Sequence, residues 1–212
     1  MVTTASRKAR TRSVPAAEPE ESVTMPAPQP QPELTTLREV YDALVDRTGL
    51  RAEIINGRLI VSPLGTPDHQ DHVGALYSAL RPNALAKGWK IYPGLDICMD
   101  GSRDPYSPDL VIAPPDAPRW GNRELLASGL VMVGEVVSRA STTDDREHKR
   151  DAYAKAGIPL YILVDALATP PTVTIFSEPK TDRYTVSALA TMGDPLPIPE
   201  PVDFTVDTAI FQ

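Results

Sequence analysis

A buried strand, a helix and a second buried strand follow one another between residues 130 and 165, and this succession restricts the fold more than any other feature. Residues 130–137 are apolar except for Glu135, residues 142–156 have the spacing of a helix that Gly157 ends, and residues 161–165 form another β-rich run. Two strands joined by a crossover helix pair in parallel within one sheet. The sequence therefore predicts an α/β domain with a mixed, partly parallel β-sheet flanked by helices.

Two more helices are predicted nearer the N-terminus. Thr36 is placed to cap apolar residues at helical spacing, and Gly49 is placed to end that helix. A second helix is expected from about Asp68. Proline lacks a backbone N–H and clashes with the preceding turn, so we expect Pro82 to kink or end this helix.

An N-terminal hairpin and further strands complete the expected fold. Asn56-Gly57 separates two β-rich runs within residues 53–61, as a type I′ turn requires. A strand over residues 89–99 is expected to break at Pro93-Gly94. The remaining strands are expected at 108–112, 172–176 and 183–188.

Residues 1–35 have the composition of a disordered tail. They include the run Pro-Ala-Pro-Gln-Pro-Gln-Pro from Pro26 to Pro32, and such a segment buries too little apolar surface to offset the entropy of ordering. The sequence therefore predicts a folded domain over residues 36–212.

Composition excludes several classes of protein. Cys98 is the single cysteine, so neither an intramolecular disulfide nor a thiolate zinc site can form, and a reducing compartment fits best. The chain has no run of eighteen apolar residues, and its N-terminus is polar and basic. We therefore expect a cytoplasmic protein without a membrane span or a secretion signal.

The net charge limits how the chain can bind a polyanion. Residues 1–36 carry four basic and four acidic residues, so the whole formal charge of −7 lies on the predicted domain. Tight, sequence-independent binding of duplex DNA needs a basic surface. Any nucleic acid is therefore expected to bind weakly or transiently.

Three charged residues converge on one place in the expected fold. Asp109 begins a strand, Glu135 lies inside the next one, and Lys149 shares the small, apolar face of the following helix. A lysine that faces a sheet needs a negative partner. Two carboxylates near strand ends also suit a hard divalent cation such as Mg²⁺.

Structural explanations exist for each of these residues. Asp109 can terminate a turn after Pro108, and Glu135 can form a structural ion pair with Lys149. Lys149 can also reach solvent, or pair with Asp145 one turn earlier. Only the combination of the three residues favours a functional site.

Several motifs resemble those of one protein family in their order and spacing. They extend over about residues 36–190 and comprise Glu53-Ile54-Ile55-Asn56-Gly57-Arg58-Leu59, His69, Ser107-Pro108-Asp109, Gly134-Glu135-Val136-Val137-Ser138, and Asp145 to Asp165 with Lys149 and Tyr153 to Tyr161. Together they resemble the Uma-type family of putative restriction endonucleases, which belongs to the PD-(D/E)XK nuclease superfamily. The resemblance implies a restriction-endonuclease-like fold and nuclease activity.

For the site, the resemblance implies that Asp109 and Glu135 are metal ligands and that Lys149 is the catalytic lysine. In the superfamily pattern the lysine stands two residues after the acid, a position that Val137 occupies here. The resemblance therefore requires that the lysine has moved to the helix, which the inward-facing register of Lys149 allows.

His69 and Glu53 are accessory candidates. The helical spacing of His69 from Val73 is typical of a hydrogen-bonded core histidine, whereas its matching position in the family places it at the rim of the site. Glu53, at the start of a hairpin strand, is either a third acid or a solvated strand residue. Two histidines are expected at the surface and one tyrosine in the helix–sheet interface: His72, His148 and Tyr153.

The predicted function is a metal-dependent endonuclease that hydrolyses phosphodiester bonds, with DNA as the expected substrate. Mg²⁺ or Mn²⁺ held by Asp109, Glu135 and the backbone carbonyl of Val136 would lower the pKa of a bound water and offset charge on the phosphate. Lys149 would orient that water or stabilise the same charge. Nuclease-like domains often pair so that each subunit cuts one strand, and a homodimer is a further expectation.

The alternative is a catalytically inactive interaction module that keeps the nuclease fold. In that case Lys149 and Glu135 form only a buried ion pair. The acidic domain and the absence of a lysine at position 137 favour this alternative. The presence of all three chemical groups in the chain argues against it.

Overall fold

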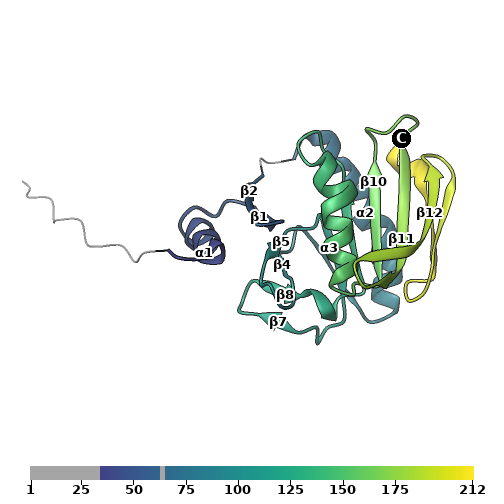
Figure 1. Ribbon diagram of the computed structural model, residues 1–212. Coiled ribbons are helices and arrows are strands. Elements are labelled where there is room, and N and C mark those ends of the chain that lie inside the picture. Colours follow the sequence, from purple (N-terminus) through teal and green to yellow (C-terminus); the bar gives the residue numbers. More distant parts are fainter. Residues whose placement is uncertain (1–33, 63–64) are drawn as a thin grey trace, which may run out of the picture. The chain divides into compact units, whose positions relative to one another are not determined.

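Six strands form the central sheet, in the order β12-β11-β10-β9-β6-β3 (Figure 1). Their bounds are β3 (Lys90–Pro93), β6 (Leu110–Ala113), β9 (Met132–Val136), β10 (Leu160–Asp165), β11 (Thr172–Lys180) and β12 (Arg183–Thr191). In this sheet β9 and β10 pair in parallel, and the other neighbours are antiparallel. The predicted mixed α/β fold and its parallel crossover are confirmed.

The protein is described here by a computed structural model that covers residues 34–62 and 65–212. The predicted tail lies outside these residues except for its last two positions. The described residues belong to one unit, Leu34–Gln212. No helix among them is long and apolar enough to cross a membrane.

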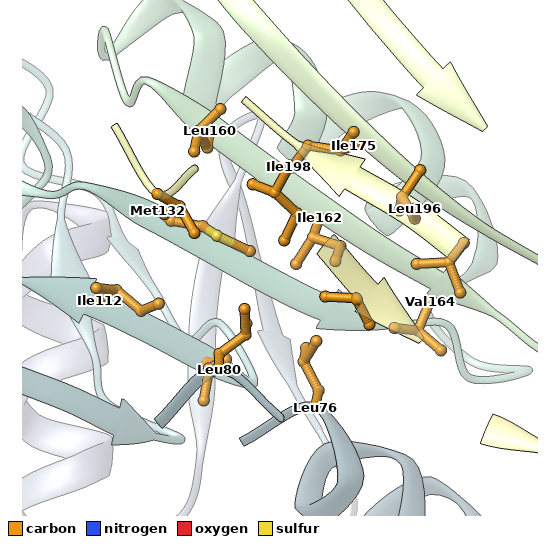
Figure 2. Packing of buried hydrophobic residues seen from close by; sticks show 14 of the residues in the cluster. Leu76, Leu80, Ile112, Met132, Leu160, Ile162, Val164, Ile175, Leu196 and Ile198 are labelled. Atoms are coloured by element: carbon orange, nitrogen blue, oxygen red, sulfur yellow. The ribbon is translucent and has the colours of Figure 1, made fainter. Parts of the chain in front are cut away.

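Helix α2 (Pro67–Ala86) covers one face of the sheet. Its residues Leu76 and Leu80 point toward Met132 and Ile162 of the strands, as Figure 2 shows. Gly134 lies under this helix, and a Cβ there would come within 3.1 Å of Leu76 Cδ2. The glycine next to Glu135 therefore allows α2 to pack closely on the sheet.

The opposite face is covered by the π-helical turn η2 (Asp144–His148) and by α3 (Lys149–Lys155), which continues it (Figure 1). Tyr153 of α3 packs with Val111, Val133 and Tyr161 in a second cluster. These strand residues alternate with those that face α2, because successive side chains of a strand point to opposite faces. Each strand of the crossover is thus buried on both sides.

The N-terminal elements follow the predicted pattern. Helix α1 (Leu37–Thr48) begins at the Thr36 cap, where Thr36 and Glu39 form a capping box, and it ends at Gly49 with a φ of 67°. Strands β1 (Ala52–Ile55) and β2 (Arg58–Val61) form the hairpin. Asn56 and Gly57 have φ values of 50° and 71°, as the type I′ turn requires.

Short elements complete the fold, and apart from Ile97–Cys98, which lies within the strand expected over 89–99, the sequence did not reveal them. A small sheet has the order β5-β4-β8-β7, and a C-terminal hairpin with a 3-10 turn packs on the α2 face. Their bounds are β4 (Ile97–Cys98), β5 (Pro105–Tyr106), β7 (Arg119–Trp120), β8 (Glu124–Leu126), η1 (Ala127–Gly129), β13 (Pro195–Ile198), β14 (Phe204–Asp207) and η3 (Thr208–Phe211). These strands are too short for periodicity to show.

One predicted element differs from the structure, and two others agree with it. The expected end or kink of the helix at Pro82 is wrong as an end, because α2 continues to Ala86; burial of Leu80 and Ala84 on either side holds the last turn against the sheet. The strand expected over 89–99 breaks at Gly94, as predicted: Gly94 has a φ of 60°, and the segments before and after it belong to two different sheets. The helix expected over 142–156 is present: residues 142 and 143 are already helical, and the π-helical turn that follows leads into α3.

Candidate active site

The sheet brings Asp109 and Glu135 to the same face. Leu110 lies opposite Gly134 in the antiparallel pair of β6 and β9, so the adjacent residues Asp109 and Glu135 are also opposite one another. Val133, two residues before Glu135, faces α3, and strand alternation places Glu135 on that side as well. Both carboxylates line one cavity of about 580 Å³.

Lys149 projects from the start of α3 into this cavity and is 3% exposed. Its Nζ lies 3.0 Å from Glu53 Oε1, 3.1 Å from Glu135 Oε1 and 3.2 Å from Asp145 Oδ1. Burial alone lowers the pKa of an ammonium, but these three carboxylates outweigh it and raise the pKa of Lys149 well above its usual value. The side chain is therefore a fixed positive charge at neutral pH.

Glu53 and Asp145 are both buried, which the sequence left open. Glu53, on β1, accepts a 2.9 Å hydrogen bond from the Ser107 amide in addition to the contact with Lys149. It is therefore not the solvated strand residue that was one of the two expectations. Asp145 lies in η2, where its Oδ2 accepts a hydrogen bond from the Ser141 hydroxyl. Its spacing of four residues from Lys149 and its place in the motifs that resemble the family were the signs of this position in the sequence.

Asp109 is surrounded by donors. Its Oδ1 lies 3.3 Å from Nη1 and 3.2 Å from Nη2 of Arg51. Its Oδ2 lies 3.2 Å from Nε2 of His69 and accepts a 2.9 Å hydrogen bond from the Val136 amide. Burial raises the pKa of Asp109, but His69, Arg51 and Val136 together lower it below its ordinary value. Arg51 is a member of the site that sequence reasoning missed.

His69 and Tyr153 each contact one of the two strand carboxylates. His69 lines the cavity, and its contact with Asp109 raises the pKa of the imidazole despite partial burial. Tyr153 fills the helix–sheet interface as expected, and its hydroxyl also donates a 2.6 Å hydrogen bond to Glu135 Oε1. Position 137 holds a buried valine that lines the cavity, so the lysine of the superfamily pattern has no counterpart there.

Two other histidines have partners outside the four buried carboxylates, and both are partly exposed, in keeping with the surface positions expected for them. His72 Nε2 lies 3.2 Å from the Phe211 carbonyl oxygen. His148 Nδ1 lies 2.7 Å from Asp144 Oδ1, and Arg58 pairs with the same oxygen. Of these residues, His72 and Asp144 line the cavity.

The buried part of the cavity contains more acidic than basic side chains. In their ionised forms, its four carboxylates outnumber the two permanent cations, Arg51 and Lys149, by two, or by one when His69 is also protonated. Burial and the neighbouring carboxylates raise the pKa of Glu135 well above its ordinary value. The carboxylates concerned are Glu53, Asp109, Glu135 and Asp145.

A divalent cation fits this donor set in charge and in chemistry. Carboxylate and carbonyl oxygens are the ligands that Mg²⁺ prefers, and four carboxylates line this cavity. The buried Asp145 Oδ1 faces the Lys149 ammonium at 3.2 Å without the geometry of a hydrogen bond. Over residues 34–62 and 65–212, no three His, Cys, Asp or Glu side chains are spaced to hold a metal ion as they stand. Three of the carboxylates instead surround the Lys149 ammonium, which supplies the positive charge in this arrangement.

Comparison with known proteins gives two matches. The family model Uma2, described as "Putative restriction endonuclease", matches residues 38–209. A crystal structure of a putative nuclease belonging to DUF820 from Anabaena variabilis is similar with a TM-score of 0.60 and 17% sequence identity, over 84% of this chain and 97% of that one. No curated protein matches the sequence. At this identity the structural match shows a shared fold.

Proposed function

Since the chain belongs to the Uma2 family of putative restriction endonucleases, we propose that it is a divalent-metal-dependent endonuclease that hydrolyses phosphodiester bonds of DNA. The observation that carries this proposal is the buried cluster of four carboxylates with only two permanent cations. A purely structural cluster gains nothing from surplus buried charge, because each unpaired buried ion costs several kcal/mol. The proposed catalytic unit is residues 36–212.

Asp109, Glu135 and the carbonyl of Val136 are the proposed ligands of Mg²⁺ or Mn²⁺. When bound, the ion would supply an activated water and charge neutralisation at the phosphate. Asp109 is suited to this role because its lowered pKa keeps it ionised. The backbone of Val136 lies next to this carboxylate, because its amide donates to Asp109 Oδ2 and the residue lines the cavity.

Lys149 is the proposed catalytic lysine. Because its pKa is raised, it holds its proton at neutral pH and cannot serve as a general base. Its ammonium can instead orient a water or stabilise negative charge that grows on the phosphate. Glu53 and Asp145 hold the ammonium from two other elements, so they fix its position relative to Glu135.

The rest of the proposal follows from charge and cysteine content. The acidic domain favours weak or transient binding of DNA, and a homodimer would allow each subunit to cut one strand. A cytoplasmic location suits a chain whose one cysteine, Cys98, is a buried free thiol.

A catalytically inactive interaction module is the second candidate. Lys149 already has three carboxylate partners within 3.2 Å, so the site satisfies this lysine without any metal. In that case the surplus charge has no chemical use, and the fold serves to bind another macromolecule.

Metal binding and plasmid cleavage distinguish the two candidates. Isothermal titration calorimetry with Mn²⁺ on the full chain should show binding, and Mn²⁺ should allow nicking of supercoiled plasmid. Asp109→Asn should weaken both, whereas Asp151→Asn, the same change at an exposed position of α3, should affect neither. Mn²⁺ binding without cleavage, or no binding at all, would favour the interaction module.

A further inference from the structure

Arg51 contacts Asp109 in an unusually loose way. Nη1 and Nη2 both approach the same oxygen, Oδ1, at 3.3 and 3.2 Å, while Nη2 also donates to the Ser107 carbonyl. Charge-assisted hydrogen bonds between guanidinium and carboxylate are normally 2.7–2.9 Å long, and the strong ones are bidentate. The pair is thus neither short nor bidentate.

Two arginine pairs in the same chain show what a fixed contact looks like. Arg38 holds both oxygens of Glu124, at 2.6 and 3.0 Å. Arg146 holds both oxygens of Asp165, at 2.8 and 3.1 Å. The hydrogen bonds from Arg51 to Asp109 are longer than the shorter bond of each of these pairs, and they reach only one carboxylate oxygen.

The remaining donor of Arg51 has no acceptor. Nε is buried and makes no hydrogen bond within residues 34–62 and 65–212, although the side chain as a whole is 35% exposed and lines the cavity. A buried donor without an acceptor costs free energy, so an incoming oxygen ligand would relieve this cost. The guanidinium fork matches the oxygens of a phosphate diester.

Asp109 in turn has little room for another cation. Arg51 occupies Oδ1, and His69 with the Val136 amide occupies Oδ2. A divalent ion can bind this carboxylate only when one of these donors withdraws. Of the cationic donors, Arg51 is the more solvent-accessible, at 35% against 11% for His69.

We propose that Arg51 is an exchangeable cation: it neutralises Asp109 while the site is free of metal, and after metal binding its guanidinium passes to a phosphate of the nucleic-acid backbone. The inference rests on the proposed nuclease function. It makes Arg51 a substrate-binding residue whose availability depends on metal binding. No covalent step is involved.

The test compares Arg51→Gln with the wild-type protein in two measurements. Without the competing cation, Mn²⁺ should bind Arg51→Gln on the order of tenfold more tightly by calorimetry. At saturating Mn²⁺, plasmid cleavage by the same variant should fall on the order of tenfold, through weaker substrate binding (a higher KM). Arg123→Gln is the matched control: Arg123 is similarly exposed and pairs with Asp42 and Asp46, none of which lines the cavity, so its loss should change neither measurement in this way.

The other possible results distinguish failure of the proposed function from failure of the proposed role of Arg51. Absence of Mn²⁺ binding to wild type would overturn the proposed function itself. Binding to wild type that is unchanged or weaker in Arg51→Gln would overturn the exchange alone. Tighter binding with undiminished cleavage would overturn the assignment to phosphate.

A second measurement covers the case in which Arg51→Gln does not fold. In wild-type protein the Nε–Hε resonance of Arg51 should shift on addition of Mg²⁺, and shift again when dimethyl phosphate is added. A resonance that neither addition moves would equally overturn the proposal.

Discussion

The Lys149 ammonium lies 3.1 Å from Oε1 of Glu135, although the two residues are 14 positions apart and belong to a helix and to the strand before it. The lysine beside Glu135 therefore comes from helix α3. In the superfamily pattern, the lysine stands two residues after the acid, on the same strand. The π-helical turn directly precedes Lys149 and contains Asp145, whose Oδ1 lies 3.2 Å from the same ammonium. π-Helical turns of this kind are frequent at functional sites.

Lys149→Met should destabilise the metal-free protein by about 3 to 5 kcal/mol, because Glu53, Glu135 and Asp145 would remain buried without their cation. Mn²⁺ should restore much of this loss, while plasmid cleavage should stay lower on the order of a hundredfold. Thermal melts with and without Mn²⁺ and the plasmid assay measure these effects. Lys155→Met, at an exposed position of the same helix, is the control.

Other results for Lys149→Met would contradict the proposed catalytic role of this lysine. Stability that is lost and not restored by Mn²⁺ would indicate a structural ion pair only. Unchanged stability together with unchanged cleavage would mean that Lys149 has neither role.

Tyr153→Phe removes the hydroxyl that donates to Glu135 and leaves the ring in place. A hydrogen bond to a charged group contributes about 1.5 to 3 kcal/mol, against about 0.5 to 1.5 kcal/mol for a neutral one. The free energy of unfolding should therefore fall more than in Tyr161→Phe, whose hydroxyl donates to the Asp145 carbonyl at 2.8 Å. Equal losses in chemical denaturation would show that Glu135 is not held as an anion by Tyr153.

The contact between His69 and Asp109 predicts a pH dependence of stability. This contact raises the pKa of His69 in the folded protein above its ordinary value of 6.5, so the protonated form is the one that folding favours. Its contribution is complete below pH 6.5 and is lost as the pH rises through the raised pKa. Melting temperatures of the metal-free protein should therefore fall over this range, and His69→Gln should reduce the slope. His72→Gln, which alters a histidine that contacts Phe211 instead, should retain it.

Pro82→Ala should stabilise α2. The proline lies inside the helix at an exposed position, and it leaves the carbonyl four residues earlier without its helical donor. Alanine supplies that donor and has the best helix propensity, so the free energy of unfolding should rise by about 1 to 3 kcal/mol. Urea denaturation measures the change, and a decrease would show that the helix depends on the proline ring.

Local chemistry in the sequence was sufficient for the regular elements and for the family. The Thr36 cap, the Asn56-Gly57 turn and the strand–helix–strand succession each depend on residues that are neighbours in the chain. Such features act over a few residues, so periodicity and turn chemistry reveal them. The same periodicity predicted that Lys149 faces the sheet, and its ammonium is buried against it.

Only the tertiary structure decided which charged groups surround Lys149 in the cavity. Arg51 precedes a hairpin strand, Glu53 lies on that strand, and Asp145 lies in a turn of the crossover helix; their common neighbourhood comes from the packing of separate elements. Periodicity shows which side chains face inward, but not which distant segments supply their partners. The continuation of α2 beyond Pro82 has a similar cause, because the buried contacts of Leu80 and Ala84 with the sheet outweigh the local preference of proline.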